Sequence, residues 1–311
     1  MDARDEAVTN GIAVDSTAEE PPESGGARPE TDDGMELVEG YDRPEPAVTE
    51  AAAAGPDTAG VDPTLERYRV DIGNASFGTG LTPETVHGPD DRRQITGNTN
   101  DYPWRVHCSL LITAADNSTW IGTGWFVSPR LLVTAGHCVF INGSAVPGQN
   151  GWVNKIRVIP GRDGSVKPFG ETTSTTFYTV KGWSEQGDPE WDYGAIALDE
   201  PLGNQTGWFG FGVYRDSDLR DTVANISGYP SDQATGTQWY AARKIDSVGP
   251  RKVSYDIDTA GGQSGAAVYR IKNGSRYGVA VHAYGGARVN SGTRINKAVF
   301  DNISKWKADH N

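Results

Sequence analysis

The sequence of 311 residues is poor in cysteine and contains no long apolar run. Its 2 cysteines are too few for a framework of disulfides or for a zinc site with four cysteine ligands. The short apolar runs exclude a transmembrane helix, and the lack of a basic stripe argues against a nucleic-acid partner. The acidic loop at 187–190 lacks the ligand spacing of an EF-hand. We therefore expect no membrane or nucleic-acid partner, no metal and no cofactor.

Negative charge is concentrated in the N-terminal part of the chain. Residues 1–84 contain 20 acidic and 5 basic side chains, whereas residues 85–311 contain 21 acidic side chains and 23 Lys or Arg. All 9 tryptophans follow residue 100. This division predicts an acidic leader over residues 1–84, followed by a nearly neutral domain over residues 85–311.

The leader has the composition of a disordered segment. Residues 1–64 are rich in Glu, Asp, Pro, Ala and Gly and contain one aromatic residue, Tyr41, so they bury too little apolar surface to offset the loss of chain entropy. Residues 65–84 carry a few apolar side chains and are expected to dock loosely on the domain. The first residues lack the basic and apolar regions of a secretory signal peptide. The sequence therefore leaves open a missing export signal, an unconventional export route and retention in the cell.

The domain has the pattern of an all-β protein. From about residue 100, short apolar or alternating runs are separated by Gly, Asn, Asp and Pro, which predicts a β-sandwich or barrel. One helix closes the chain, because apolar side chains recur there at helical spacing. They are Ile295, Val299, Ile303 and Trp306.

Three short segments together contain the residue types of a nucleophilic site. They are Val-Thr-Ala-Gly-His-Cys at 133–138, Asp-Tyr-Gly-Ala-Ile at 192–196 and Asp-Thr-Ala-Gly-Gly-Gln-Ser-Gly at 258–265. A serine hydroxyl needs a base to remove its proton, and imidazole has a suitable pKa. A buried carboxylate then holds the imidazole in the required tautomer. Each segment alone is more often structural, but together they predict catalytic His137, Asp192 and Ser264.

The glycines before Ser264 suit an oxyanion hole. A turn without side chains lets backbone N–H groups point at a developing negative charge, and the expected donors are the N–H groups of Gly262 and Ser264. The nucleophile elbow of the α/β-hydrolases is excluded because position 266 is Ala, where that motif requires Gly.

These segments resemble those of the trypsin-like serine proteases and, among them, the bacterial glutamyl endopeptidases. The resemblance covers nearly all of residues 84–307 and implies two antiparallel six-stranded β-barrels followed by a C-terminal helix. His137 and Asp192 would come from the first barrel and Ser264 from the second. It also implies a secreted, monomeric endopeptidase that acts on proteins or peptides. Further matching segments are Ile-Ser-Gly-Tyr-Pro at 226–230, Gly-Thr-Gln-Trp at 236–239 and Ala-Val-His at 280–282.

Two residues indicate the substrate preference. Thr259 and His282 match residues that line the specificity pocket of glutamyl endopeptidases and bind the substrate carboxylate. A buried carboxylate needs hydrogen-bond donors, which a hydroxyl and an imidazole N–H supply. We therefore expect cleavage after Glu and, more weakly, after Asp. The alternative for His282 is a satisfied histidine in the core.

Two positions depart from the trypsin-like pattern. Gln263 stands where most members have the Asp that pairs with the new N-terminus, so that activation switch cannot operate in its usual form. Thr123 stands where the disulfide partner of the cysteine after the catalytic His usually lies. A hairpin between Cys108 and Trp125 brings Cys108 towards Cys138, and a disulfide between these cysteines is expected. Two buried free thiols are the alternative.

The leader is expected to be a propeptide. The resemblance begins at Glu84-Thr85-Val86-His87-Gly88, where mature glutamyl endopeptidases start, and Glu84 is the residue type that this enzyme is expected to recognise. The freed ammonium group of Thr85 would lie near the substrate carboxylate and add to the selectivity for Glu. A permanent, solubilising tail is the alternative.

Other functions fit parts of this pattern. They are an endopeptidase of the same fold with a preference for Asp or small residues, an inert protease-like binding module, and a regulatory intracellular protease. An inert module would be expected to lack a catalytic residue or an oxyanion glycine, and the sequence retains all of them.

Overall fold

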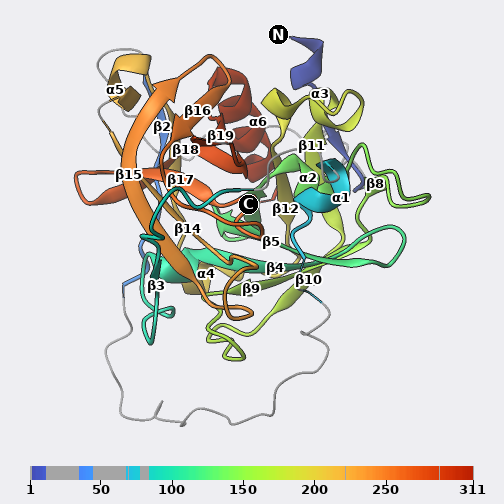
Figure 1. Cartoon of the computed structure of the whole chain (residues 1–311), viewed down its shortest axis with the longest axis horizontal. Coiled ribbons are helices and arrows are strands. Elements are labelled where there is room, and N and C mark those ends of the chain that lie inside the picture. The colour runs from blue at the N-terminus through green and yellow to red at the C-terminus, as the bar shows by residue number, and fades with distance from the viewer. Residues whose placement is uncertain are drawn as a thin grey trace, which may run out of the picture.

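The computed structural model describes residues 2–11, 35–44, 68, 70–77, 84–220, 222–286 and 288–310 (Figure 1). Most of the regular structure lies in two sheets of 8 and 9 strands, which form two barrels side by side. Their strand pairs are antiparallel except for β13 with β18. The second barrel is drawn in orange and red in Figure 1, and the first mainly in green. The predicted all-β class is confirmed.

The first barrel is closed by a strand that is interrupted at one residue. β10 pairs with β9 and β11 pairs with β12, so residues 172–180 together serve as the sixth strand. All pairings around the ring are antiparallel. Its strands are β4 (His107–Thr113), β5 (Thr119–Phe126), β6 (Leu131–Thr134), β9 (Lys155–Pro160), β10 (Thr172–Ser174), β11 (Thr176–Val180) and β12 (Gly194–Ala197).

The second barrel is closed because β17 pairs with both β14 and β18. One further strand, β13 (Gly210–Val213), runs parallel to β18 on the outside of this ring. The six strands of the ring are β14 (Val223–Gly228), β15 (Trp239–Val248), β16 (Lys252–Tyr255), β17 (Ala267–Lys272), β18 (Ser275–Tyr284) and β19 (Asn290–Arg294).

The C-terminal helix forms where the sequence predicts it. α6 (Lys297–Ala308) begins after Asn296, whose side chain accepts a hydrogen bond from Val299 N and so caps the first turn. Its apolar stripe is buried against the barrels, which holds the end of the chain in place.

No helix in the described ranges is long and apolar enough to cross a membrane. The shorter helices are α1 (Gly73–Phe77), α2 (Gly136–Val139), α3 (Lys181–Ser184), α4 (Gly203–Thr206), α5 (Asp216–Arg220), η1 (Ala3–Asp5), η4 (Trp104–Val106) and η5 (Pro189–Trp191), and the remaining short strands are β3 (Arg93–Gln94), β7 (Phe140–Ile141) and β8 (Gly151–Trp152).

Parts of the leader add strands to both barrels. β1 (Ala7–Thr9) pairs antiparallel with β11, and β2 (Glu36–Val38) pairs antiparallel with β13. Before β1, the buried carboxylate of Asp5 accepts hydrogen bonds from Arg251 at 2.9 and 2.8 Å and from Trp191 Nε1 at 2.8 Å. These contacts correct the expectation of disorder for residues 2–11 and 35–44. The rest of residues 1–64 lies outside the described residues.

Composition misses these strands for a physical reason. A disorder argument from composition asks whether a segment can build a core of its own, but a strand added to the edge of an existing sheet takes its hydrogen bonds from that edge. Ala7 and Val38 need only to pack on a core that the barrels have already formed. Three-residue strands therefore form here without any strong apolar pattern.

The expected disulfide is absent, and Cys108 and Cys138 are buried free thiols. Cys108 lies opposite Gly124 in the β4–β5 register, whereas a Cβ atom placed on Gly122 would lie 3.0 Å from Cys138 Sγ. Two residues along a strand span about 6.6 Å, whereas a disulfide holds its Cβ atoms about 3.8 Å apart. The hairpin brings the two cysteines into one core but at different levels, and burial raises the pKa of the Cys108 thiol well above its ordinary value.

Candidate active site

His137 follows the end of β6, where the chain turns into α2. Its Nδ1 atom lies 2.7 Å from Asp192 Oδ2, and its backbone N–H donates to Asp192 Oδ1 at 2.9 Å. Both side chains are fully buried. Two contacts to one carboxylate fix both the backbone and the ring of His137, so the structure brings these two predicted residues together.

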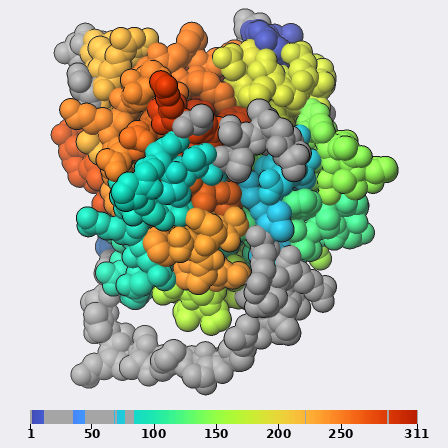
Figure 2. All heavy atoms as spheres, viewed as in Figure 1, coloured from blue at the N-terminus to red at the C-terminus, as the bar shows by residue number. Residues whose placement is uncertain are grey.

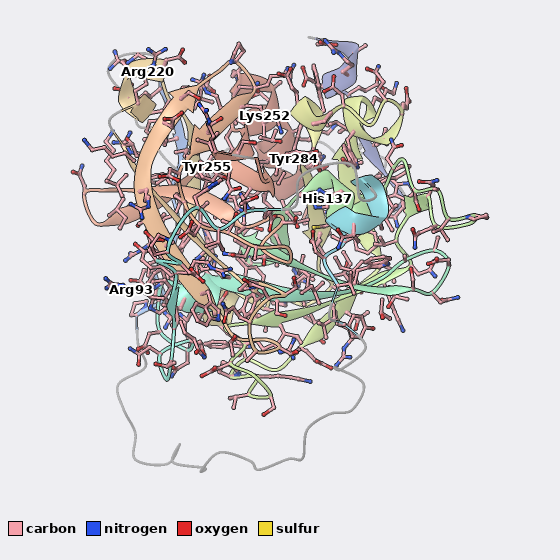
Figure 3. All side chains as sticks on the ribbon, viewed as in Figure 1. Arg93, His137, Arg220, Lys252, Tyr255 and Tyr284 are labelled. Atoms are coloured by element: carbon pink, nitrogen blue, oxygen red, sulfur yellow. The ribbon has the colours of Figure 1, made fainter. Side chains whose placement is uncertain are left out.

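Asp192 also receives a hydrogen bond from the second barrel. Tyr284, on β18, donates its hydroxyl to Asp192 Oδ2, and Thr293 Oγ1 donates to the backbone carbonyl of Asp192 at 3.0 Å. Figure 3 shows His137 and Tyr284 near each other, and their ring centroids are 6.5 Å apart. The orientation of the carboxylate is therefore fixed from both barrels.

The ionisation of the pair follows from these contacts. Burial by itself would raise the pKa of Asp192, but the imidazole and the hydrogen bonds from His137 and Tyr284 lower it below its ordinary value. Burial also opposes a charge on His137, yet Asp192 raises the pKa of His137 well above its ordinary value. Asp192 is thus held as a carboxylate that can stabilise an imidazolium ion.

Ser264 lies in a loop that two glycines shape. Gly262 has φ 98° and Gly265 has φ 89°, which are left-handed values that residues with side chains rarely adopt. A Cβ atom on Gly265 would lie 2.1 Å from Thr134 Oγ1. Glycine therefore lets this loop of the second barrel press against the segment of the first barrel that leads into His137.

Gln263 closes the same loop without an ion pair. Its side-chain Oε1 accepts a hydrogen bond from Ala260 N at 3.0 Å, and its backbone N–H donates to Ala260 O at 3.1 Å. The side chain is buried. Most trypsin-like proteases have an Asp at this position. Here Gln263 stabilises the loop through its two hydrogen bonds to Ala260, so the loop needs no new N-terminal ammonium group to form.

The two residues expected to bind a carboxylate are both fully buried. Tyr255 lies with its hydroxyl 2.6 Å from His282 Nδ1. Because burial raises the pKa of Tyr255 well above its ordinary value, this hydroxyl stays protonated and donates a hydrogen bond to Nδ1, so Nε2 carries the imidazole N–H. The hydroxyl of Thr259 has no hydrogen-bond partner among the described residues. Both groups are suited to donate to an anion.

A carboxylate from the leader occupies this position. Glu84 is 8% exposed, and its Oε1 atom accepts a hydrogen bond from Ser264 Oγ at 2.8 Å. The same oxygen lies 3.2 Å from His282 Nε2. The structure therefore places a glutamate side chain between the predicted nucleophile and the predicted pocket histidine.

Thr85 is held beside the pocket by its backbone. Asn290 accepts a hydrogen bond from Thr85 N at 3.2 Å and donates one to Thr85 O at 2.8 Å, and Thr259 N donates to Thr85 O at 3.4 Å. Two residues further on, His87 N donates to Asp258 Oδ1 at 2.6 Å. These contacts fasten the start of the domain next to the predicted carboxylate site.

Sequence reasoning missed three residues that support this site, namely Tyr255, Tyr284 and Asn290. Tyr255 and Asn290 are direct partners in the β16–β19 register, which brings them together from positions far apart in the chain. Neither lies in a recognisable motif. For Tyr284, alternation along the strand gives no signal, because a register shift lies between His282 and Tyr284.

Comparison with known proteins gives the family. The trypsin-like peptidase domain family matches residues 122–279. A Bacillus licheniformis protein named glutamyl endopeptidase is 40% identical over 234 residues, which are 72% of this chain and 69% of that protein. A Bacillus subtilis protein named extracellular metalloprotease is 38% identical over 228 residues, 73% of this chain and 71% of that protein. No group of three or more His, Cys, Asp or Glu in the described part of this chain is arranged to hold a metal ion.

Solved structures agree with this assignment. A Glu endopeptidase in complex with MPD superposes with a TM-score of 0.62 at 26% identity, covering 72% of this chain and 100% of that chain. The protease Anisep from Arthrobacter nicotinovorans shares the fold, with a TM-score of 0.55 at 17% identity over 65% of this chain and 96% of that chain. The chain belongs to the trypsin-like serine proteases. It is a serine endopeptidase, is similar to the glutamyl endopeptidases, and acts on proteins or peptides.

Proposed function

We propose that this endopeptidase cleaves peptide bonds after Glu and, more weakly, after Asp. The observation that carries the proposal is the position of Glu84, whose carboxylate contacts both Ser264 and His282. The Glu84 carboxylate reaches His282 but not Thr259, whose hydroxyl has no partner among the described residues and would remain available to a substrate glutamate. The similarity to proteins named glutamyl endopeptidases supports the same preference.

In the proposed mechanism, Ser264, His137 and Asp192 act as a catalytic triad. Ser264 Oγ attacks the carbonyl carbon of the scissile bond, while His137 takes the hydroxyl proton and passes it to the leaving amine. Asp192 holds the imidazole through Nδ1 and stabilises its charged form. Water then hydrolyses the acyl-enzyme with His137 acting again as base.

The oxyanion of each tetrahedral intermediate would be bound by the backbone N–H groups of Gly262 and Ser264. The left-handed conformation of Gly262 supports this role, because a Cβ atom there would lie 2.5 Å from Tyr229 O. Donors that are already oriented stabilise the transition state without further rearrangement, and one such donor contributes about 10²–10³-fold to the rate.

The pocket would bind the substrate carboxylate through Thr259 and His282. The hydroxyl of Thr259 is free to donate, and the Nε2–H of His282 is aimed by Tyr255. Both donors are neutral, so a substrate charge gains from a nearby cation. After removal of the leader, the ammonium group of Thr85 would supply that charge.

A peptide-library digest read by mass spectrometry tests this substrate preference. We expect cuts after Glu to dominate, and cuts after Asp to be about 10–200-fold less efficient, because the two side chains differ by one methylene. A digest dominated by cuts after Lys, Arg or aromatic residues would show that Thr259 and His282 do not form the specificity pocket.

We also propose that residues 1–84 are a propeptide and that the mature chain begins at Thr85. The change in charge at this boundary and the contacts of Glu84 and Thr85 with the site support this boundary. The mature enzyme would act as a monomer outside the cell. The name of the Bacillus subtilis relative, which describes that protein as extracellular, supports the location.

N-terminal sequencing of active enzyme tests the maturation. We expect the sequence Thr-Val-His-Gly, because cleavage after Glu84 leaves Thr85 first. The Glu84→Gln variant should mature far more slowly if the enzyme processes itself, because a neutral amide satisfies the pocket donors less well. Full activity with residues 1–84 still attached would contradict the propeptide role. Normal maturation of Glu84→Gln would assign the cut to another protease.

A further inference from the structure

Lys252, at the start of β16, places its ammonium group in the interior of the protein. The Nζ atom is buried and has no hydrogen-bond partner among the described residues. It lies 3.9 Å from the centroid of the Tyr284 ring. A buried charge without a hydrogen bond is costly unless other charges or an aromatic face stabilise it. The residues around Lys252 must therefore supply that stabilisation.

The ring that lies against Lys252 belongs to the residue that holds Asp192 from the second barrel. Tyr284 donates its hydroxyl to Asp192 Oδ2, the same oxygen that lies 2.7 Å from His137 Nδ1. Burial and the charge of Asp192 raise the pKa of Tyr284 well above its ordinary value, so this hydroxyl remains a donor. A cation on the face of a phenol ring withdraws electron density from it and strengthens its O–H group as a donor. Figure 3 labels Lys252, Tyr284 and His137, which follow one another from β16 towards α2.

The charged neighbours of Lys252 come from the connection between β11 and β12. Figure 2 shows this connection (yellow) beside the orange and red atoms of the second barrel. Burial lowers the pKa of Lys252 to about 8, although Asp192, Glu190 and Asp188 each raise it. Among these three carboxylates, Asp192 has the largest effect on the ammonium group. At neutral pH Lys252 is therefore mostly a cation, and it interacts with the carboxylate that holds His137.

A cation at this place changes the basicity of His137. Burial opposes a charge on His137, but Asp192 raises its pKa well above the ordinary value. A general base must be free of its proton at the working pH, so too large a rise would leave the imidazole protonated and inactive. A positive charge beyond Asp192 disfavours the imidazolium ion and lowers this pKa. The other titratable groups that face His137 are the thiol of Cys138 and, from the leader, Asp71.

We propose that Lys252 is a positioning residue for the catalytic pair, whose ammonium group strengthens the hydrogen bond from Tyr284 to Asp192 and offsets part of the negative charge that Asp192 presents to His137. This inference rests on the proposed function, because it takes His137 as the base that activates Ser264. Lys252 itself does not touch the substrate and transfers no proton. It acts through Tyr284 and through its charge.

The pH dependence of Ser264 labelling by a neutral fluorophosphonate probe tests this role on active enzyme. The probe carries no carboxylate, so the loss of labelling at acidic pH follows the protonation of His137. In Lys252→Met, the midpoint of this loss should move to higher pH by about 0.5–1 unit, which is about 3–10-fold slower labelling below the midpoint. Lys252→Arg keeps the charge and should restore the wild-type midpoint. Lys244→Met, which removes an exposed lysine of the same barrel, should leave it unchanged.

A double-variant comparison tests whether the effect passes through Tyr284. Tyr284→Phe keeps the ring but removes the hydroxyl, so Asp192 loses a donor and the midpoint should also rise. In the Tyr284→Phe background, Lys252→Met should move the midpoint less than it does in the wild type, because the hydrogen bond that it weakens is already gone. Equal movements in both backgrounds would overturn the role of Tyr284.

The Lys252→Met protein should fold, because a neutral side chain removes the cost of burying a charge. Thermal unfolding checks this, and Lys252→Gln is a second neutral variant with the same expected shift. A folded, neutral variant with the wild-type midpoint overturns the proposal and leaves the proposed function intact. Slower labelling by the same factor at every pH also overturns it, because a merely structural role would not move the midpoint. Undiminished labelling of Ser264→Ala would instead overturn the proposed mechanism itself.

Discussion

Replacement of Ser264 by Ala should lower kcat of the processed enzyme by several orders of magnitude, on the order of 10⁴–10⁶-fold. Without the hydroxyl there is no nucleophile for the acyl-enzyme, and the remaining activity comes from binding and the oxyanion donors. His137→Ala should cost a similar factor, because nucleophile and base act as one unit. The double variant should be only slightly worse than either single variant. Steady-state kinetics with a Glu peptide measures all three.

The structure also predicts that the Ser264→Ala variant folds. The hydroxyl of Ser264 contacts Glu84 of the leader, and its backbone hydrogen bonds do not depend on the side chain. The Ser264→Ala protein should therefore keep its thermal unfolding temperature while it loses fluorophosphonate labelling. Ser254→Ala, on β16, is a control that should keep both activity and labelling. Near wild-type cleavage by Ser264→Ala would end the proposed mechanism.

Replacement of His282 by Ala should lower kcat/KM for Glu peptides by about 10–150-fold, because a hydrogen bond from a neutral donor to a charged group contributes about 1.5–3 kcal/mol. The wild-type enzyme should cleave Gln peptides poorly, because an amide satisfies donors arranged for an anion less well. In His282→Ala the difference between Glu and Gln peptides should therefore shrink. Paired kinetics on two peptides that differ only at this residue measures the change.

Tyr255→Phe is the graded control for His282. It keeps the imidazole but removes the hydroxyl that fixes the Nε2–H tautomer, so we expect a loss of about 10-fold on Glu peptides. His310→Ala, at the C-terminal end of the chain, should leave the selectivity unchanged. If His282→Ala slows Glu and Gln peptides by the same factor, His282 supports the fold and does not recognise the carboxylate.

The sequence predicts an all-β fold because its strands are short and are separated by turn residues that act locally, whereas the two barrels were expected from the family resemblance. His137, Asp192 and Ser264 are recognisable for a similar reason, since each lies in a short segment with a characteristic pattern. Their mutual distances come from the way the two barrels pack, which no local pattern contains. The sequence therefore indicates the roles of these residues but not the distances between them.

Other features depend on register and on long-range contact. The disulfide prediction was wrong because the hairpin places Cys108 and Cys138 at different levels of the core. Tyr255 and Asn290 reach the pocket through strand pairing alone. The strands of the leader depend on backbone hydrogen bonds to sheet edges. Composition and periodicity describe side chains along one segment and carry little information about such pairings.

The separate contacts of the leader make its release a problem of avidity. β1 pairs with the first barrel, β2 pairs with β13 beside the second, and the described residues 70–77 and 84 contact β5 and the candidate active site. Segments that are linked in one chain rebind at an effective concentration of about millimolar, so a single cut leaves all of them bound. Further cuts between the contacts would convert one multivalent ligand into weak monovalent fragments. The sequence offers glutamates for such cuts on both sides of β2: Glu19, Glu20, Glu23 and Glu30 before it, and Glu45, Glu50 and Glu66 after it.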